Sequence, residues 1–279
     1  MITCNLKGGL GNQLFEIFAT MSYAIDSDHI FYFKSKYALN SGVTQRHTYW
    51  HSLLVFLKKH LTDSIYNHNM KIVREKSFSY EELPITTLLD NIILDGYFQS
   101  HKYFEKNHKQ IYDYLQLEVL KKKATCKYNY NYKEFISMHF RQGDYKNLQG
   151  THPILTYKYY ENSLKEVLKK TNNKLQKILY FCEKEDNEEI EKIIGEIKKT
   201  IKNCAFIKVT DNVEDWQQLL LMSACSHNII ANSTFSWWGA YLNTNPTKIV
   251  CYPEVWFGPK APNDTTDLFP ESWTKISCV

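Results

Sequence analysis

The sequence predicts an α/β fold, and three observations carry that prediction. The chain opens with an apolar segment, a glycine-rich turn and a segment of helical periodicity, which is the order strand, turn, helix. In the second half, short apolar segments alternate with longer helical ones, and strands separated by helices pair in parallel. The composition is that of a globular protein, because 43% of the 279 residues are hydrophobic and 23% are charged.

The first half is expected to alternate strands and helices less regularly. Strands are predicted at residues 2–6, 29–33 and 91–97, and helices at residues 14–25 and 103–118. Residues 37–84 show little periodicity and are expected to form irregular helices. The polar segment 121–133 is rich in lysine, asparagine and tyrosine and is interpreted as a linker. It separates predicted domains at residues 1–125 and 134–279.

The second half is expected to form one parallel sheet covered by helices. Strands are predicted at residues 135–140, 177–182, 205–209, 227–231 and 248–252, and helices at residues 157–170, 188–200, 216–223 and 236–242. Ligands of such a sheet lie beyond the carboxyl ends of its strands. We therefore expect the rim of a pocket in the loops that follow Phe140, Cys182, Val209 and Ala231.

Several classes of protein are disfavoured. The net charge is +4 and the lysines are scattered among 30 acidic residues, so a nucleic-acid partner gains little support. No apolar stretch is long enough to cross a bilayer, and the first residues lack the features of a signal peptide. The 7 cysteines show no C-x-x-C spacing and indicate reduced thiols. We therefore expect a cytoplasmic protein.

The segment after the predicted strand 135–140 carries the most chemistry. His139, Arg141, Gly143 and Asp144 follow one another closely there. A guanidinium offers a fork of donors that suits a diphosphate, and a glycine lets a ligand approach the backbone. Arg141 is therefore predicted to stabilise an anionic leaving group. For Arg141 the alternative is a surface arginine that pairs with Asp144. For His139 the alternative to a contact with a base or phosphate is a histidine that is buried in the core.

A second polar segment follows the predicted strand 227–231 and precedes a helix. It consists of Asn232, Ser233, Thr234, Phe235 and Ser236. Hydroxyl side chains are ordinary helix N-caps, but a helix N-terminus ringed by hydroxyls also suits a diphosphate. The glycine-rich turn at residues 8–13 is a weaker signal, because it matches no phosphate-binding motif and equally fits a tight turn.

Four segments, in this order, resemble the fucosyltransferases of glycosyltransferase family 11. They are GGLGNQLF at residues 8–15, GYFQSHKYF at 96–104, HFRQGDY at 139–145 and IIANSTFSWWGA at 229–240. Together with Tyr252-Pro253 and the WFG at 256–258, the resemblance spans about residues 5–258. Members of this family transfer L-fucose from GDP-fucose to galactose in an α-1,2 linkage.

The resemblance implies a GT-B fold, in which two Rossmann-like domains face a cleft. The first domain would hold mainly the acceptor, and the second would hold GDP-fucose. Arg141 would contact the β-phosphate, and His139 would lie near the nucleotide. The cleft would be lined from the first domain by Gly11, Asn12 and Gln13. The donor site would be completed by Asn232, Ser233, Thr234, Phe235 and Ser236.

The implied reaction is a single displacement with inversion. The departing diphosphate would be stabilised by Arg141, Ser233, Thr234 and Ser236. Gln142 stands where many family members carry a second arginine, which leaves Arg141 with a larger share of the charge. Asp144 is the first candidate for the base that deprotonates the acceptor hydroxyl, or it only orients Arg141. His152 and Asp95 are weaker candidates.

No metal or other cofactor is expected, since GDP-fucose is a substrate. Asp26-Ser27-Asp28 spells the D-x-D of metal-dependent transferases, but it stands at a helix end, where turn chemistry explains it. Two acidic segments, 183–186 and 211–215, follow predicted strands. They are interpreted as solvated helix starts or as contacts to the ribose or guanine of the donor.

The expected partners are GDP-fucose and a galactose-containing oligosaccharide or lipid-linked glycan. Peripheral contact with the cytoplasmic face of the inner membrane is a further expectation. His47, Tyr49 and Trp50 form either a sugar platform or part of the core. The alternative functions are a fucosyltransferase of another linkage, such as the 1,6-type or the protein O-type, and a catalytically dead glycan-binding relative.

Overall fold

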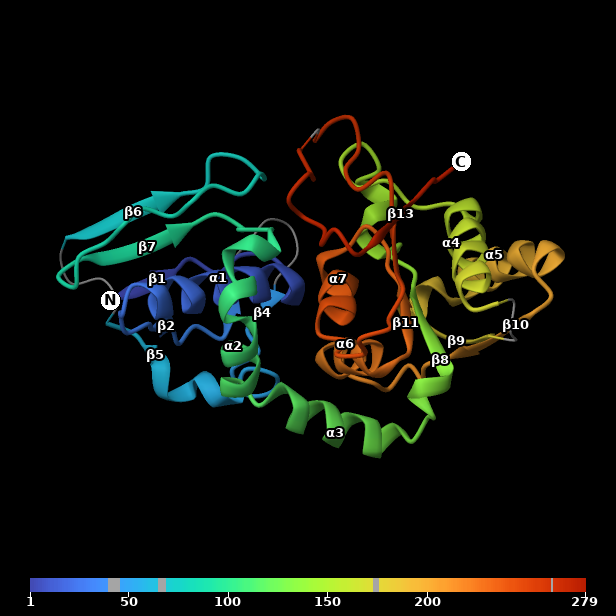
Figure 1. The fold of residues 1–279 in the computed structure, drawn as a ribbon, viewed down its shortest axis with the longest axis horizontal. Coiled ribbons are helices and arrows are strands. Elements are labelled where there is room, and N and C mark those ends of the chain that lie inside the picture. The colour runs from blue at the N-terminus through green and yellow to red at the C-terminus, as the bar shows by residue number, and fades with distance from the viewer. Residues whose placement is uncertain (40–45, 65–68, 173–175, 262) are drawn as a thin grey trace. The chain divides into compact units, whose positions relative to one another are not determined.

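The computed structural model describes residues 1–39, 46–64, 69–172, 176–261 and 263–279. The chain divides into two compact units, each of which is described by itself (Figure 1). Unit 1 comprises Met1–Leu120 and Asn263–Pro270, and unit 2 comprises Lys121–Pro262 and Glu271–Val279. A short segment near the C-terminus therefore belongs to unit 1.

Unit 1 is built on a 3-stranded parallel sheet in the order β1-β7-β6. Its strands are β1 (Ile2–Cys4), β6 (Met70–Arg74) and β7 (Asn91–Asp95). The glycine-rich turn leads from β1 into α1 (Leu10–Asp26), which is buried along most of its length. The strand and helix predicted at the N-terminus and the strand predicted at 91–97 are therefore confirmed.

The middle of unit 1 differs from the prediction. Instead of a strand at 29–33, there is an isolated bridge between Ile2 and Phe31, followed by β2 (Phe33–Lys34). Besides the short helix η1, the described part of 37–84 holds strands where irregular helices were expected. These elements are β3 (Ala38–Leu39), β4 (Arg46–His47), η1 (Val55–His60), β5 (Leu61–Thr62) and β6. The sequence conceals β6 because it is an edge strand whose Ile72 is 54% exposed, so no apolar alternation marks it.

The helix predicted at 103–118 is broken into shorter pieces. These are η2 (His101–Tyr103), η3 (Glu105–Asn107), α2 (His108–Tyr114) and α3 (Leu117–Tyr128). Gln116 adopts a left-handed backbone with φ 50° and separates α2 from α3. Most of the segment interpreted as a linker is therefore helical. The buried residues Leu117, Leu120 and Ala124 have helical spacing, which the intervening lysines hide in the sequence.

Unit 2 is built on a 6-stranded parallel sheet in the order β10-β9-β8-β11-β12-β13. The strands are β8 (Phe135–His139), β9 (Gln176–Phe181), β10 (Cys204–Lys208), β11 (His227–Ile229), β12 (Val250–Pro253) and β13 (Thr274–Ile276). The helices are α4 (Tyr157–Lys170), α5 (Asn187–Thr200), α6 (Asp215–Ala224) and α7 (Thr234–Tyr241). Every strand and helix predicted here is confirmed, and the described elements that were missed are the short strand β13 and the short helices η4 (Tyr132–Glu134), η5 (Gly143–Asn147) and η6 (Lys184–Asp186). The α/β prediction is therefore confirmed, while the arrangement of two domains across a cleft stays a prediction.

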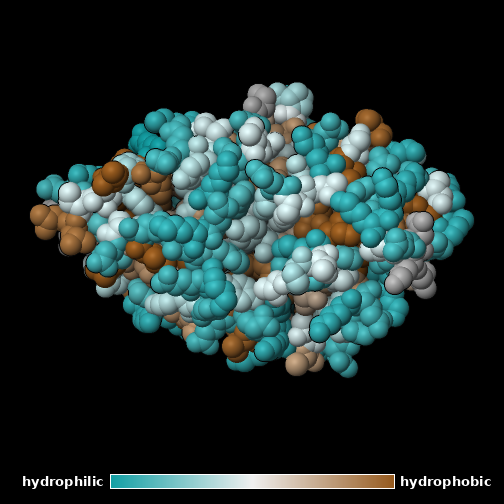
Figure 2. Space-filling view, in the orientation of Figure 1, coloured by the Kyte–Doolittle hydropathy of each residue, from teal (hydrophilic) through white to brown (hydrophobic). Residues whose placement is uncertain are grey.

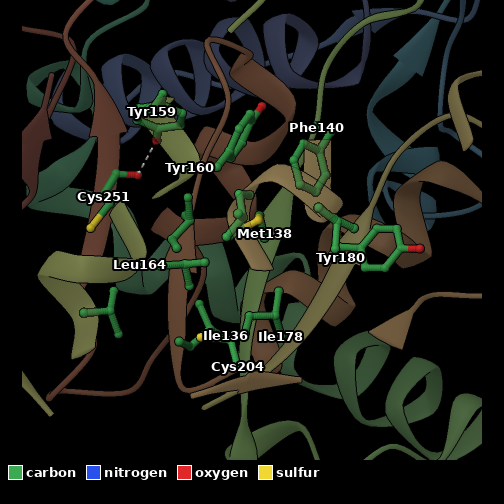
Figure 3. Close-up of a cluster of buried hydrophobic side chains, with 14 of the residues drawn as sticks. Ile136, Met138, Phe140, Tyr159, Tyr160, Leu164, Ile178, Tyr180, Cys204 and Cys251 are labelled. Carbon is green, nitrogen blue, oxygen red and sulfur yellow. Dashed lines mark hydrogen bonds between the residues drawn. The ribbon is translucent and has the colours of Figure 1, made fainter. Parts of the chain in front are cut away.

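The alternation of side chains along β8 decides which face of the sheet becomes the site. Ile136, Met138 and Phe140 lie in a buried cluster with side chains from β9 and α4 (Figure 3). Because successive side chains of a strand point to opposite faces, Ser137 and His139 face the other side. Asn228 of β11 confirms this placement, since its amide donates to Ser137 Oγ at 2.7 Å.

The described residues also bear on the expected environment of the chain. None of the helices among them is long and apolar enough to cross a membrane. All seven cysteines are free thiols, as predicted. Hydrophilic residues cover most of the face shown in Figure 2, with smaller apolar groups between them.

Candidate active site

Arg141 lies at the carboxyl end of β8 in unit 2, where the sequence placed it. Its side chain is 19% exposed and forms ion pairs with Asp144 and Glu183. The guanidinium carbon lies 5.0 Å from the centre of the Tyr145 ring. Burial lowers the pKa of Arg141, but Glu183 and Asp144 raise it more, and the net shift is upward. Arg141 therefore stays positively charged although its side chain is largely buried.

The turn after Arg141 is held by the loop that follows β9. Residues Gly143–Asn147 form the short helix η5, and Gly143 has φ 38°. The Gly143 N–H donates to the Asp186 carboxylate at 2.9 Å, and Lys146 Nζ lies 2.8 Å from the same carboxylate. Asp186 is 1% exposed, so it is a structural anchor and not part of a solvated helix start. That interpretation was wrong for Asp186.

His139 is buried, as one of its two alternatives predicted, and its place near a nucleotide stays a prediction. Its ring lies 5.5 Å from that of Phe235, centre to centre. Burial, with a smaller contribution from Arg141, lowers the pKa of His139 to about 3. Its Nδ1 has no hydrogen-bond partner in the described part of the chain. The structure thus places a neutral imidazole beside the cation of Arg141.

The polar segment before α7 meets the Arg141 turn through Tyr145. The Tyr145 hydroxyl donates to the backbone oxygen of Asn232 at 3.1 Å. The Asn232 amide donates to the backbone oxygens of Pro153 at 2.9 Å and Trp256 at 3.2 Å. Its buried Oδ1 has no partner among the described residues. Asn232 is therefore a fixed side chain with one acceptor atom still unused.

The hydroxyl residues of this segment surround the start of α7. Ser233 occupies the N-cap position with an extended backbone, but its side chain makes no capping hydrogen bond. The buried Ser236 hydroxyl donates weakly to the backbone oxygens of Ala231 and Ser233, at 3.5 Å and 3.3 Å. Thr234 and Phe235 form the first turn of α7. The ordinary capping role therefore does not account for the Ser233 side chain.

The three candidate bases differ in how strongly they are engaged. Asp144 is paired with Arg141 and is 35% exposed. The His152 ring stacks on Tyr145 at 4.8 Å, and burial lowers the pKa of His152. Asp95 belongs to unit 1 and pairs with Lys7 at 2.6 Å, which lowers the pKa of Asp95. Asp144 and His152 thus both belong to the surroundings of Tyr145 within unit 2, whereas Asp95 does not.

The glycine-rich turn of unit 1 is held by hydrogen bonds to other groups of the same unit. Lys7 N–H donates to the carboxylate of Glu16 at 2.9 Å. The buried Gln13 amide donates to the backbone oxygens of Gly8 at 3.1 Å and His47 at 2.9 Å. Asn12 accepts from the Gln99 amide at 3.2 Å, and Gly11 is buried within α1. The donor-binding role of Gly11, Asn12 and Gln13 stays a prediction.

Two other expectations in unit 1 can be compared with the structure. Tyr49 and Trp50 are buried, so the core alternative is confirmed for them, while His47 is exposed. Asp26 ends α1 and binds Lys106 and Asn107, and Asp28 has φ 54°. The D-x-D segment is a helix-end turn, as predicted.

Comparison with known proteins gives the family. The model of glycosyl transferase family 11 matches residues 1–277. The chain belongs to glycosyl transferase family 11. It is 25% identical, over 301 residues, to an alpha-1,2-colitosyltransferase of Escherichia coli, and the alignment covers 99% of each chain. The family that the sequence motifs indicated is therefore confirmed.

Two further proteins resemble this family 11 chain. It is 34% identical, over 146 residues, to the O-antigen biosynthesis glycosyltransferase WbnK of Escherichia coli. That alignment covers 50% of this chain and 44% of WbnK. A structure of an Arabidopsis thaliana FUT1 mutant in complex with GDP aligns with a TM-score of 0.49 and 12% identity. That alignment covers 96% of this chain and 74% of FUT1.

Sequence reasoning missed several residues of this family 11 site. Tyr145 and Trp256 stand inside the motifs, but only their contacts with Arg141 and Asn232 give them a role. The carboxylates of Glu183 and Asp186 were assigned to solvent or to the nucleoside. Their position after β9, beside β8 in the sheet, was the available signal. The acidic segment 211–215 leads into α6, and its acidic residues are exposed, so the interpretation as a solvated helix start is confirmed for it.

Proposed function

We propose that the chain is an inverting α-1,2-fucosyltransferase that moves L-fucose from GDP-fucose to the 2-hydroxyl of a terminal galactose. The observation that carries this proposal is the largely buried cation of Arg141 at the carboxyl end of β8, joined through Tyr145 to the segment before α7. A permanent cation and a helix N-terminus on one sheet edge suit a nucleotide diphosphate. Membership of family 11 supports the glycosyl transfer.

In the proposed reaction one bond of the anomeric carbon breaks and another forms on the opposite face of the sugar. The bond between the anomeric carbon of fucose and the β-phosphate oxygen breaks, and its electron pair stays on GDP. Arg141 neutralises that charge, with the hydroxyls of Ser233, Thr234 and Ser236 as further donors. The acceptor oxygen attacks the opposite face of the sugar, so the configuration inverts. His139 is neutral, so Arg141 carries the positive charge at this end of β8 without help from the imidazole.

The proton of the acceptor hydroxyl must pass to a base, and we assign that role to Asp144. Asp144 is more exposed than Arg141 and lies three residues after it in the chain. The group that binds the leaving diphosphate and the base for the acceptor would therefore belong to the same turn. Asp144→Asn is therefore expected to lower kcat far more than it weakens GDP binding, and equal loss of both would assign Asp144 only to orientation of Arg141.

The deciding experiment combines purified protein, GDP-fucose and a panel of β-galactosides. We expect release of GDP and a product whose linkage analysis shows fucose on the 2-hydroxyl of galactose. Fucose on another hydroxyl would support a transferase of different linkage, such as the 1,6-type. Glycan binding without any GDP release would support a catalytically dead relative.

A second donor is favoured by one finding. The relative aligned over 99% of both chains is named an alpha-1,2-colitosyltransferase. Colitose is a deoxy form of L-fucose, so the same diphosphate site would serve both donors. Parallel assays with the two GDP-sugars, at equal concentration, decide between them by the ratio of kcat/KM.

The proposed acceptor is a galactose-containing glycan of the O-antigen type, in line with the name of WbnK. Such glycans are built on lipid carriers, so we propose peripheral contact with the cytoplasmic face of the inner membrane. Ile85, Leu88 and Leu89 in unit 1 are 102%, 69% and 91% exposed and are suited to that contact. Replacing all three by serine is expected to reduce co-sedimentation with anionic vesicles, and unchanged sedimentation would contradict the membrane contact.

A further inference from the structure

Arg141 is held by two carboxylates that come from different parts of unit 2. Asp144 follows it by three residues, whereas Glu183 is 42 residues away and follows β9. Glu183 contacts one terminal nitrogen of the guanidinium and Asp144 contacts the other. Both terminal nitrogens are therefore occupied before any donor binds. The local balance is one cation against two anions.

A diphosphate needs the same guanidinium atoms. An arginine binds phosphate oxygens through its N–H donors, and here each terminal nitrogen already contacts a different carboxylate. Bringing a polyanion next to two carboxylates is unfavourable, because like charges at contact repel strongly in a partly buried site. The departure of one carboxylate from Arg141 when the donor binds would relieve this repulsion and free N–H donors for the diphosphate.

We propose that Glu183 is a positioning residue that holds Arg141 in the unliganded protein and gives up its place to the diphosphate of the donor. This inference rests on the proposed function. On binding, the Glu183 carboxylate moves into water and Arg141 turns its freed nitrogen to the β-phosphate. After transfer the carboxylate returns to Arg141 and competes with GDP, which speeds product release.

The structure favours Glu183 over Asp144 as the group that moves. The Glu183 side chain is 47% exposed and that of Asp144 is 35% exposed, so water replaces the ion pair of Glu183 more easily. The loop after β9 also does not depend on Glu183. Buried Asp186 fixes it through the Gly143 N–H and Lys146, at 2.9 Å and 2.8 Å. Glu183 can therefore leave while the loop stays in place.

Gly143 provides the space that Glu183 occupies. A Cβ atom at this position would lie 2.5 Å from Glu183 Oε2 and 2.8 Å from its carboxyl carbon. Any larger residue would thus push the carboxylate away from the turn. The glycine of the motif serves this contact as well as the positive φ of the turn.

Isothermal titration with GDP tests the proposal directly. Glu183→Gln keeps the shape and removes the charge, so it should bind GDP about threefold to tenfold more tightly than the wild type. Glu183→Asp, whose carboxylate is too short for the same contact, should shift the affinity in the same direction. The matched control is Glu189→Gln, because Glu189 is 49% exposed and pairs with Lys146 at 2.6 Å instead of Arg141. Its affinity for GDP should equal that of the wild type.

Steady-state kinetics separates this role from a merely structural one. Glu183→Gln should lower KM for GDP-fucose and strengthen product inhibition by GDP, with kcat no higher than that of the wild type. Equal or weaker GDP binding in Glu183→Gln, together with normal transfer by the wild type, would overturn this inference alone. A wild-type chain that binds neither GDP nor inorganic pyrophosphate would overturn the proposed function as well.

Discussion

A buried titratable group lies at the carboxyl edge of each parallel sheet, Glu16 in one and His139 in the other, and the two have opposite character. In unit 1, α1 carries Glu16, which is fully buried, and burial raises its pKa well above the usual value. In unit 2, β8 carries His139, and burial lowers its pKa to about 3. The two shifts have the same cause, because a low-dielectric interior penalises the charged form of both groups.

The surroundings of the two groups differ in how a neighbouring cation is held. Glu16 accepts the Lys7 N–H and closes the glycine-rich turn, while Lys7 Nζ is taken by Asp95. His139 leaves its neighbour Arg141 as the charged group of its edge, held by carboxylates that are partly exposed. In unit 1 the buried acid Glu16 therefore accompanies a turn whose Lys7 is bound within the unit. In unit 2 the buried neutral His139 accompanies Arg141, whose partly exposed carboxylate partners can be replaced.

The largest expected effect on activity comes from comparing the arginine at each sheet edge, Arg141 in unit 2 and Arg74 in unit 1. Arg141→Ala should lower kcat about a hundredfold to a thousandfold, because it removes the cation that stabilises the leaving diphosphate. Arg74 ends β6 on the edge of unit 1, is 74% exposed and lies 3.4 Å from Asp95. Arg74→Ala should keep most of the activity. Rates of GDP release from GDP-fucose measure both, and equal losses would end the functional contrast between the edges.

The next effect concerns the stability of unit 1 at rising pH. The folded pKa of Glu16 lies above 4.5, its unfolded value, so the folded state binds more protons between the two values. The free energy of unfolding contributed by this group therefore falls as pH rises above 4.5, until the folded pKa is passed. Glu16→Gln should remove that slope. Urea unfolding of both proteins at pH 5 and pH 8 compares them, and parallel curves would contradict the buried acid.

His139 should show the opposite slope. Its folded pKa of about 3 lies below the unfolded value of 6.5, so the unfolded state binds more protons in that window. The free energy of unfolding should fall by roughly 1 kcal/mol for each pH unit below 6.5, down to the folded pKa. His139→Asn should be less sensitive to acid than the wild type. Nuclear magnetic resonance titration of the ring offers a direct check, since a pKa near 6.5 would contradict the burial.

The smallest expected effect is that of metal removal. If Arg141 carries the charge of the leaving group, transfer should be the same in EDTA and in buffer with Mn²⁺ or Mg²⁺. The assay is the rate of GDP-fucose consumption after exhaustive chelation. An absolute requirement for either cation would move the leaving-group chemistry away from Arg141 and weaken the contrast between the two edges.

The success of sequence prediction differs between the units for a physical reason. In unit 2 the inner strands β8, β9, β11 and β12 are mostly buried, so each appears as an apolar run between helical segments, and of the described strands only the short β13 was missed. In unit 1 the edge strand β6 is exposed, and short strands replace the irregular helices expected around it. Periodicity reports burial, so it fails where an element has little to bury.

The sequence by itself determined the α/β class, the family and the position of Arg141 at a strand end, because these follow from local periodicity and from motifs read in order. Only the tertiary structure decided the partners of Arg141 and Asn232. Glu183 and Tyr145 reach them across 42 and 87 residues of chain. It also decided the directions in which the pKa values of Glu16 and His139 shift, because burial is a property of the packed sheet and not of the residues next to them in sequence.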